Sequence, residues 1–327
     1  MSYDVIGIGN AMVDVIGHAD DAFLDRMKIE KGIMQLVERD RAEELYAAMT
    51  DRTETPGGSV ANTIAGLGRL GMASAFLGKV ADDALGRAYA AGMEEFGIGF
   101  PNRPVPGGET PTSRCMIFVS PDGERSMNTY LGAGADFSRE GVPPEAFRNG
   151  RILFLEGYLF DKPEGKGAFL EAARLMHEAG GEAGITLSDP FCCERHRDDF
   201  QGLLTGEMDF VIGNEAEWTT LYDCDLDTAL DRAAAACRTV VCTRSDDPVL
   251  ILRDGTRTEI PVTRVTPVDA TGAGDQFAAG FIYGYASGRD METCGRMGVL
   301  AGAEVIGHIG PRPERDMAAL FRAEGLL

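Results

Sequence analysis

The run Asp269-Ala270-Thr271-Gly272-Ala273-Gly274-Asp275 stands directly before an apolar segment, residues 277–285, that is typical of a buried helix. Gly272 and Gly274 permit a tight turn whose N–H groups are clear of any Cβ atom, and the start of the following helix adds partial positive charge. We therefore predict that residues 272–275, called the anion turn below, bind an anion. The plainer alternative is an ordinary helix start capped by Thr271 or Asp275.

Asp275 adds a second chemical function to this turn. Its carboxylate would lie at the edge of the anion turn because it follows the glycines directly. From there it can accept a proton from a hydroxyl group that attacks a phosphoryl group held over the glycines. The candidate catalytic residues here are Gly272, Ala273, Gly274 and Asp275.

A second glycine pair opens a helix far upstream, in Gly57-Gly58-Ser59-Val60-Ala61-Asn62. Asn62 lies in the first turn of that predicted helix, where its amide can reach a polar ligand. The apolar residues that follow recur at helical spacing and share one face: Val60, Ile64, Leu67 and Leu70. Two helices that both open on glycines suggest the two halves of one cleft.

Apolar runs typical of β-strands alternate with helical stretches along the chain. The predicted strands are residues 5–9, 73–80, 152–158, 183–189, 208–214 and 239–243, and the helices between them include 166–180 and 226–237. This alternation predicts an α/β fold with a mostly parallel sheet and helices on both faces. Ligands of such sheets bind beyond the carboxyl ends of the strands.

Two stretches interrupt the alternation. Residues 112–131 read as a hairpin that turns at Pro121-Asp122-Gly123, and residues 13–37 hold two short β-prone pieces around a helical segment. The simplest arrangement is a small antiparallel flap that covers the ligand edge of the sheet and acts as a lid. We predict one domain over residues 1–327, with a lid built from residues 13–38 and 110–133.

The charge balance limits the partners of the protein. The chain of 327 residues has 52 acidic and 31 basic residues, so its formal net charge is −21. Nucleic acids and anionic membranes are disfavoured as partners because they require clustered Lys and Arg. A phosphate ligand must therefore be held locally, by backbone N–H groups and one or two basic side chains.

Other patterns indicate a reduced, soluble protein. The seven cysteines are odd in number, scattered and mostly within apolar runs, as expected of reduced packing residues. We find no leader sequence, and no apolar stretch approaches the ~20 residues needed to span a bilayer, so we expect a cytoplasmic protein. Cys192, Cys193 and His196 match no common zinc spacing.

Two common nucleotide-binding motifs do not fit the chain. Gly66-Leu67-Gly68-Arg69-Leu70-Gly71 has dinucleotide-binding spacing, but it ends a helical pattern instead of joining a strand to a helix. A Walker-type run and the catalytic loop of protein kinases are both absent from the sequence.

Further polar residues follow predicted strands. Asn214 and Glu217 lie three positions apart just beyond residues 208–213, so both can orient water around Mg²⁺ from one face of a helical turn. An ordinary asparagine cap followed by first-turn acids is an equally good interpretation. Asp14, after the first strand, is either a solvated acid or a carboxylate that binds ligand hydroxyls.

In their order along the chain, four motifs resemble those of the ribokinase-like kinases of the phosphofructokinase B type. They are Gly9-Asn10-Ala11-Met12-Val13-Asp14, the run 57–62, Asn214-Glu215-Ala216-Glu217 and the run 269–275. Within that family the chain is most similar to the adenosine kinases, through the runs 122–126, 131–135, 187–191 and 308–313. The resemblance covers nearly the whole chain and implies a three-layer α/β/α fold with a small β lid.

The resemblance also implies roles for individual residues. Asp275 would be the general base, the N–H groups of the anion turn would form an anion hole, and Arg125 would approach the transferred phosphoryl group. Asn214 and Glu217 would serve the water shell of Mg²⁺ and the phosphates, Thr243 and Arg244 would lie near the nucleotide, and Asp269 would lie near a monovalent cation such as K⁺. The acceptor would be bound by Asn10, Asp14, Gly57, Gly58 and Asn62.

The expected reaction is transfer of the γ-phosphoryl group of ATP to the 5′-hydroxyl of adenosine. Tyr158, Phe160 and Phe191 lie near predicted strand ends, and each either stacks on the purine or packs in the core. The alternatives are a sugar acceptor (ribose, fructose or 2-keto-3-deoxygluconate), inosine or guanosine, or a catalytically silent nucleoside-binding protein. A monomer and a homodimer both remain open.

Overall fold

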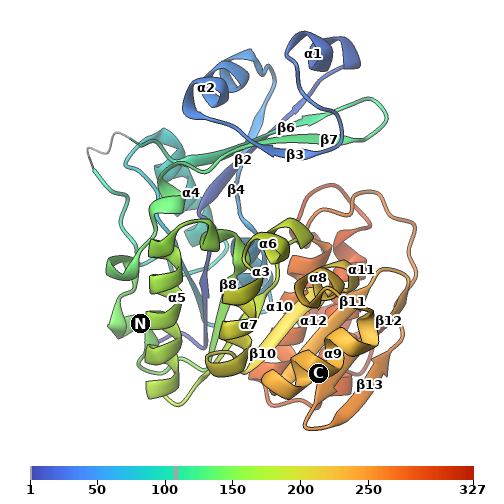
Figure 1. Ribbon diagram of the computed structural model, residues 1–327. Coiled ribbons are helices and arrows are strands. Elements are labelled where there is room, and N and C mark those ends of the chain that lie inside the picture. Colours follow the sequence, from blue (N-terminus) through green and yellow to red (C-terminus); the bar gives the residue numbers. More distant parts are fainter. Residues whose placement is uncertain (1, 107–109) are drawn as a thin grey trace.

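The computed structural model describes residues 2–106 and 110–327, and its main body is built on an eight-stranded sheet (Figure 1). The strand order is β13-β12-β11-β10-β9-β8-β1-β5. The parallel strands are β1 (Val5–Ile8), β5 (Ser74–Leu77), β8 (Ile152–Glu156), β9 (Glu182–Thr186), β10 (Phe210–Asn214) and β11 (Thr239–Arg244). All six fall within or beside strands predicted from the sequence, which confirms the mostly parallel sheet.

Two antiparallel strands at one edge were not predicted from the sequence. They are β12 (Asp247–Arg253) and β13 (Thr256–Ile260). The run Asp246-Asp247-Pro248 before the apolar part of β12 is typical of a loop, and β13 carries mostly polar side chains because it lies at the sheet edge. Neither strand therefore has the uniform apolar pattern of the buried parallel strands.

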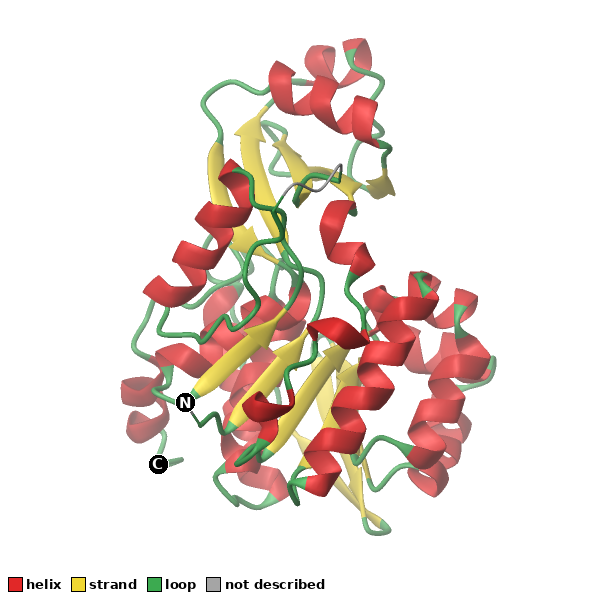
Figure 2. Cartoon of the chain, turned by 90° about the vertical axis from the view of Figure 1, so that its left-hand side faces the viewer, coloured by secondary structure: helices red, strands yellow, loops and turns green. Residues whose placement is uncertain are grey.

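Helices cover both faces of the main sheet, so the predicted three-layer architecture is confirmed (Figure 2). The layer that carries the anion turn consists of α3 (Ser59–Arg69), α10 (Ala273–Ala286) and α11 (Met291–Val305), with α12 (Met317–Ala323) packed against α11. The opposite layer consists of α5 (Pro163–Glu178), α6 (Pro190–Arg195), α7 (Arg197–Gly206), α8 (Glu215–Tyr222) and α9 (Leu226–Ala236).

A second sheet of five strands lies above the main body (Figure 1). Its order is β3 (Met34–Leu36), β7 (Arg125–Tyr130), β6 (Ser113–Val119), β2 (Met12–His18) and β4 (Thr53–Gly57). The other helical elements are α1 (Asp21–Arg26), α2 (Arg39–Ala48), α4 (Ala84–Glu95) and the 3₁₀ turns Gly132–Asp136, Arg139–Gly141, Pro144–Phe147 and Gly157–Asp161.

The predicted antiparallel flap is wrong in its strand directions. The β6–β7 hairpin is antiparallel as predicted, but β2 pairs in parallel with β6 and β3 pairs in parallel with β7. Long chain excursions separate the members of both parallel pairs, so turn geometry does not force them to run antiparallel. The sheet also includes β4, which the predicted lid segments omit because Thr-Glu-Thr-Pro-Gly has a weak strand pattern.

Glycines allow the helices of the site layer to pack closely. A Cβ atom at Gly66 of α3 would lie 2.3 Å from Oε1 of Gln276 in α10, and one at Gly280 of α10 would lie 2.3 Å from the Met297 carbonyl oxygen in α11. Asp275, the predicted general base, therefore lies on α10, a helix that packs closely against α3 on one side and α11 on the other. In the described ranges, 2–106 and 110–327, no helix combines the length and apolar character needed to cross a bilayer.

We predict that Gly280→Ala lowers the free energy of unfolding, by about 1–3 kcal/mol, because the added methyl group meets backbone atoms of α11 that cannot rotate away. The control is Gly202→Ala in α7, where an added Cβ atom meets nothing within 4 Å, and we expect a gain of up to ~1 kcal/mol. Urea denaturation of both variants measures the difference, and equal stabilisation of the two would contradict this packing.

Candidate active site

Asp275 lies in the first turn of α10 and is held by two side chains of α3. Its Oδ1 accepts a hydrogen bond from Oγ of Ser59 at 2.7 Å, and its Oδ2 accepts one from Nδ2 of Asn62 at 3.0 Å. Burial raises the pKa of Asp275 to about 6, while these two hydrogen bonds and the charge of Arg312 lower it. A carboxylate with this pKa is suited to accept a proton near neutral pH.

The anion turn has the backbone conformation that an anion site needs. Gly272 is the N-cap of α10 with φ of 80°, and a Cβ atom there would lie 2.5 Å from Cα of Pro311. The amides of Gly274 and Asp275 have no intrahelical acceptor because of their place in the first turn. A Cβ atom added at Gly274 would meet nothing within 4 Å, so no neighbouring group packs against that side of the turn.

The plainer interpretation of the anion turn is not what the structure shows. The N-cap is Gly272, not Thr271 or Asp275. The Thr271 side chain donates instead to Oδ1 of Asp269 at 2.7 Å. Neither side chain therefore closes off the amides at the start of the helix.

The second glycine pair brings Asp14 to the same region. A Cβ atom at Gly57 would lie 2.3 Å from Oδ2 of Asp14, so this carboxylate rests against the β4 backbone at a place where only glycine fits. Gly58 has φ of 102° and lies against the carbonyl oxygen of Asn10. Burial raises the pKa of Asp14 to about 7, Arg312 and Arg125 lower it, and Asp275 raises it.

Glu156, at the end of β8, joins the two halves of the site and was missed from the sequence. Its carboxylate accepts hydrogen bonds from the backbone N of Asn10 at 2.8 Å, the side-chain amide of Asn10 at 3.2 Å and the backbone N of Val60 at 2.9 Å. It is 1% exposed, and burial raises its pKa to about 7. A glutamate that ends an apolar strand gives no sequence signal of such a role.

Asn10 retains an acceptor for a ligand. Its amide nitrogen is used by Glu156, but its Oδ1 is buried and has no hydrogen-bond partner within the part of the chain that the structure describes. A buried acceptor without a donor is costly, so a ligand hydroxyl would satisfy it.

Asp269 and Arg125 connect the small sheet to the anion turn. Nη2 of Arg125, in β7, lies 2.5 Å from Oδ2 of Asp269, which also accepts a hydrogen bond from the Gly310 amide at 2.9 Å. Oδ1 of Asp269 accepts from the amide and the hydroxyl of Thr271. Protein donors thus contact both carboxylate oxygens, and the hydrogen bonds lower the pKa of Asp269 despite its burial.

Asn214 and Glu217 form a reciprocal capping box at the start of α8. The Glu217 amide donates to Oδ1 of Asn214 at 2.9 Å, and the Asn214 amide donates to Oε2 of Glu217 at 2.8 Å. Burial raises the pKa of Glu217 to about 7. The capping interpretation is therefore what the structure shows, and a role in a Mg²⁺ water shell stays a prediction.

Thr243 and Arg244 end β11 at the same edge of the sheet as Asn214. Both are half-buried, and Nε of Arg244 donates to the carbonyl oxygen of Pro248 at 2.8 Å. Their role near a nucleotide stays a prediction.

The three candidate aromatic residues have different environments. Phe160 is 3% exposed and packs against Phe169 and Phe200, so its suggested stacking on a ligand is wrong: it is a core residue. Phe191 is 71% exposed at the start of α6. Tyr158 is half-buried and donates its hydroxyl hydrogen to the Ser188 carbonyl oxygen at 3.2 Å. Tyr158 and Phe191 remain candidates.

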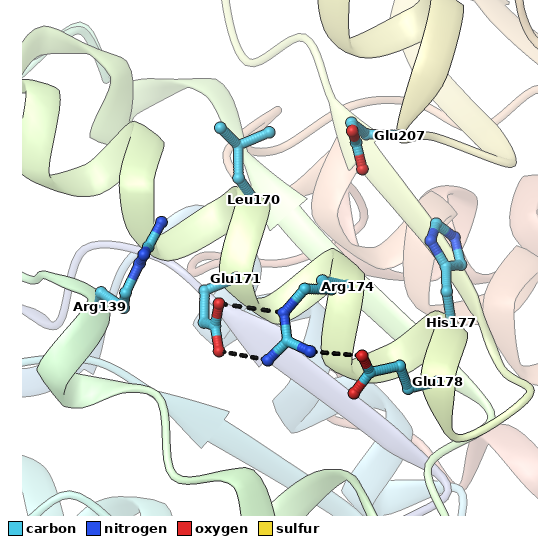
Figure 3. A pocket seen from close by; sticks show the side chains of 7 residues that line it. All are labelled: Arg139, Leu170, Glu171, Arg174, His177, Glu178 and Glu207. Atoms are coloured by element: carbon cyan, nitrogen blue, oxygen red, sulfur yellow. Dashed lines mark hydrogen bonds and ion pairs between the residues drawn. The ribbon is translucent and has the colours of Figure 1, made fainter.

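A surface hollow on α5 is separate from this site (Figure 3). Arg174 crosses it and forms ion pairs with Glu171 and Glu178, so these charged side chains of the helix face engage one another. The hollow lies on the helix layer opposite α10. Among the described residues, no group of three or more His, Cys, Asp and Glu side chains is arranged to hold a metal ion, including around Cys192 and His196.

The protein groups at the site indicate how a Mg²⁺ ion would be held. This ion keeps several waters and is bound through one or two carboxylates together with substrate phosphates. Because no group of three or more His, Cys, Asp and Glu side chains is arranged to hold a metal ion among the described residues, a Mg²⁺ ion would be held mainly through the nucleotide phosphates.

Comparison with known proteins identifies the same family as the motifs. Residues 24–316 match the model of the pfkB family of carbohydrate kinases. The chain is 28% identical to adenosine kinase 1 of Arabidopsis thaliana over 94% of each chain.

Solved structures that resemble this chain support the same family assignment. A probable sugar kinase from Rhizobium etli superposes with a TM-score of 0.91 at 42% identity, covering 99% of each chain. Adenosine kinase from Sinorhizobium meliloti superposes with a TM-score of 0.90 at 44% identity, covering 98% of this chain and 99% of that one. These relatives confirm the ribokinase-like fold and the prediction of an enzyme. The chain belongs to the pfkB family of carbohydrate kinases and is a phosphotransferase that acts on an alcohol group.

Proposed function

We propose that the chain transfers the γ-phosphoryl group of ATP to the 5′-hydroxyl of adenosine, giving AMP and ADP. One observation carries the proposal: the Asp275 carboxylate is held by Ser59 and Asn62 beside the free amides of the anion turn. The likeness to the Sinorhizobium meliloti adenosine kinase over nearly the whole chain supports adenosine as the acceptor.

The acceptor is held by groups from both halves of the site. Asp14 accepts hydrogen bonds from the ribose hydroxyls, and the partnerless Oδ1 of Asn10 accepts another. Gly57 and Gly58 let the Asp14 carboxylate and the Asn10 carbonyl oxygen lie directly against the backbone, which brings Asp14 to the acceptor. These contacts present the 5′-oxygen to Asp275 and remove much of the entropic cost of the reaction.

Asp275 acts as the general base. The 5′-oxygen attacks the γ-phosphorus, the bond from that phosphorus to the β–γ bridging oxygen breaks, and the proton passes to Asp275. The amides of Gly274 and Asp275 donate to the oxygens of the transferred group, whose charge is spread in the transition state. Arg125 lies within the same region and adds positive charge from the lid.

ATP and Mg²⁺ complete the site. Mg²⁺ neutralises phosphate charge when the nucleotide is bound, and Asn214 and Glu217 would orient its water shell. Thr243 and Arg244 would lie along the nucleotide phosphates. A K⁺ ion beside Asp269 stays a prediction, and it would have to share a carboxylate that Arg125, Thr271 and Gly310 already contact.

A second candidate function keeps the mechanism and changes the acceptor to a sugar. The likeness to the probable sugar kinase from Rhizobium etli favours it. Inosine and guanosine are further acceptors with the same ribose. The choice depends on whether a purine pocket exists near Tyr158 and Phe191.

We predict that adenosine is the preferred acceptor in a parallel assay of ADP release from Mg·ATP. The panel is adenosine, inosine, guanosine, ribose, fructose and 2-keto-3-deoxygluconate. We expect kcat/KM for adenosine to exceed that for the free sugars by at least ~10²-fold, since sugars forgo the contacts made by the purine. Turnover on a sugar alone would overturn the adenosine assignment and leave the kinase mechanism intact.

We predict that Asp275→Asn lowers kcat by about 10²–10⁴-fold with a smaller change in KM, because the amide cannot accept the proton. Asp290→Asn is the matched control: Asp290 caps α11, and asparagine caps a helix equally well. Steady-state kinetics on the preferred acceptor measure both variants. Full activity of Asp275→Asn would rule out Asp275 as the base.

A further inference from the structure

We propose that Arg312, in the C-terminal segment between α11 and α12, is a positioning residue for Asp275: it orients the Asn62 amide and places a positive charge beside the base. This inference rests on the proposed function, in which Asp275 is the base. Neither the composition nor the motif pattern assigns any role to Arg312.

Hydrogen bonds connect Arg312 to Asp275 through Asn62. Nε of Arg312 donates to Oδ1 of Asn62 at 3.3 Å, and Nδ2 of Asn62 donates to Oδ2 of Asp275 at 3.0 Å. Because Arg312 has donors only, it requires the Asn62 oxygen to face it. The Asn62 NH₂ group must then face Asp275, so Arg312 excludes the flipped amide that would set oxygen against carboxylate.

A second set of hydrogen bonds links the segment around Arg312 to the helix that carries Asp275. Gln276 is the residue after Asp275. Its Nε2 donates hydrogen bonds to the backbone carbonyl oxygens of Asn62 and Pro311, both at 2.9 Å. Pro311 precedes Arg312 and also fills the space beside Gly272. The segment that carries Arg312 is therefore bound to the helix that carries the base.

The guanidinium is itself fixed in place. Its Nη2 donates to the Pro56 carbonyl oxygen in β4 at 2.6 Å, and its carbon lies 4.5 Å from the centre of the Phe96 ring. Its Nη1 is buried and has no hydrogen-bond partner among the described residues. The guanidinium thus contacts three elements, and among the described residues it forms no ion pair with a carboxylate, so its charge acts on the whole acidic cluster.

That cluster determines the electrostatic effect. The groups that face Asp275 are Ser59 and Asn62 from α3, Asp14 from β2, Glu156 from β8, the Tyr158 hydroxyl and Arg312 itself. The two carboxylates disfavour a charged Asp275, whereas Arg312 favours it. Removing the positive charge therefore raises the pKa of Asp275 above its value of about 6.

The experiment compares Arg312→Gln, Arg312→Lys and Arg69→Gln with the unchanged enzyme. Arg69 is the matched control because its guanidinium lies over the same Phe96 ring, 5.1 Å from its centre, while the side chain is exposed. The readouts are the pH profile of kcat/KM on the preferred acceptor and a ¹³C NMR titration of aspartate-labelled protein, with Asp275→Asn identifying the Asp275 signal. Melting temperatures report folding.

We expect Arg312→Gln to lower kcat/KM by about 10–10²-fold, since the base loses its alignment, and to move the acidic limb to higher pH. Arg312→Lys keeps the positive charge, so we expect the acidic limb of its pH profile to return toward that of the unchanged enzyme. Its kcat/KM should recover only in part. Arg69→Gln leaves both unchanged.

The inference would be overturned if Arg312→Gln melts near the temperature of the unchanged protein and the NMR titration gives the same pKa for Asp275. The NMR titration needs no acceptor, so it decides the matter even if no panel compound is phosphorylated. Failure on the whole panel would count against the proposed function alone.

Discussion

The packing of α3 against α10 is the contact on which the site depends. α3 carries Ser59 and Asn62, which hold the Asp275 carboxylate, and α10 carries Asp275 itself, the proposed base. Gly66 allows the two helices to approach so closely that a single added Cβ atom would overlap the Gln276 side chain. Glu156 then fixes the start of α3 to the end of β1 through three hydrogen bonds. Small shifts here would separate the base from the acceptor.

The second constraint is charge. The protein has a formal net charge of −21, yet its proposed ligands carry phosphate. The site resolves this conflict with backbone amides at a helix start, which bind anions without a basic cluster. Burial raises the pKa values of Asp14, Glu156 and Asp275 into the range of about 6 to 7, which limits negative charge in the cleft. The guanidinium groups of Arg125 and Arg312 provide the remaining compensation.

Much of this arrangement could be predicted from the sequence because its signals are local. The glycine turns, the buried parallel strands and the β6–β7 hairpin each have a pattern within a few residues. The direction of β2 and β3, and the inclusion of β4, depend on which distant strand each one meets, and no local pattern encodes that.

The contacts between distant residues that build the site could not be predicted from local patterns either. Glu156 and Arg312 look like ordinary polar residues in the sequence, and their roles arise from neighbours more than ninety positions away. Phe160 shows the reverse error, since an aromatic residue after a strand has the same pattern whether it faces a ligand or the core. Local patterns thus indicated the glycine turn at residues 272–275, whereas the residues that support it required the fold.

In the proposed mechanism, Asp14 and Asn10 present one hydroxyl of the acceptor to the γ-phosphoryl group beside Asp275. The most direct test is ³¹P NMR of the products formed from Mg·ATP and adenosine. We expect equal amounts of ADP and of a monoester whose phosphorus is coupled to the two protons of the 5′-carbon. Inorganic phosphate as the main product, or a phosphate attached to the 2′- or 3′-oxygen, would contradict it.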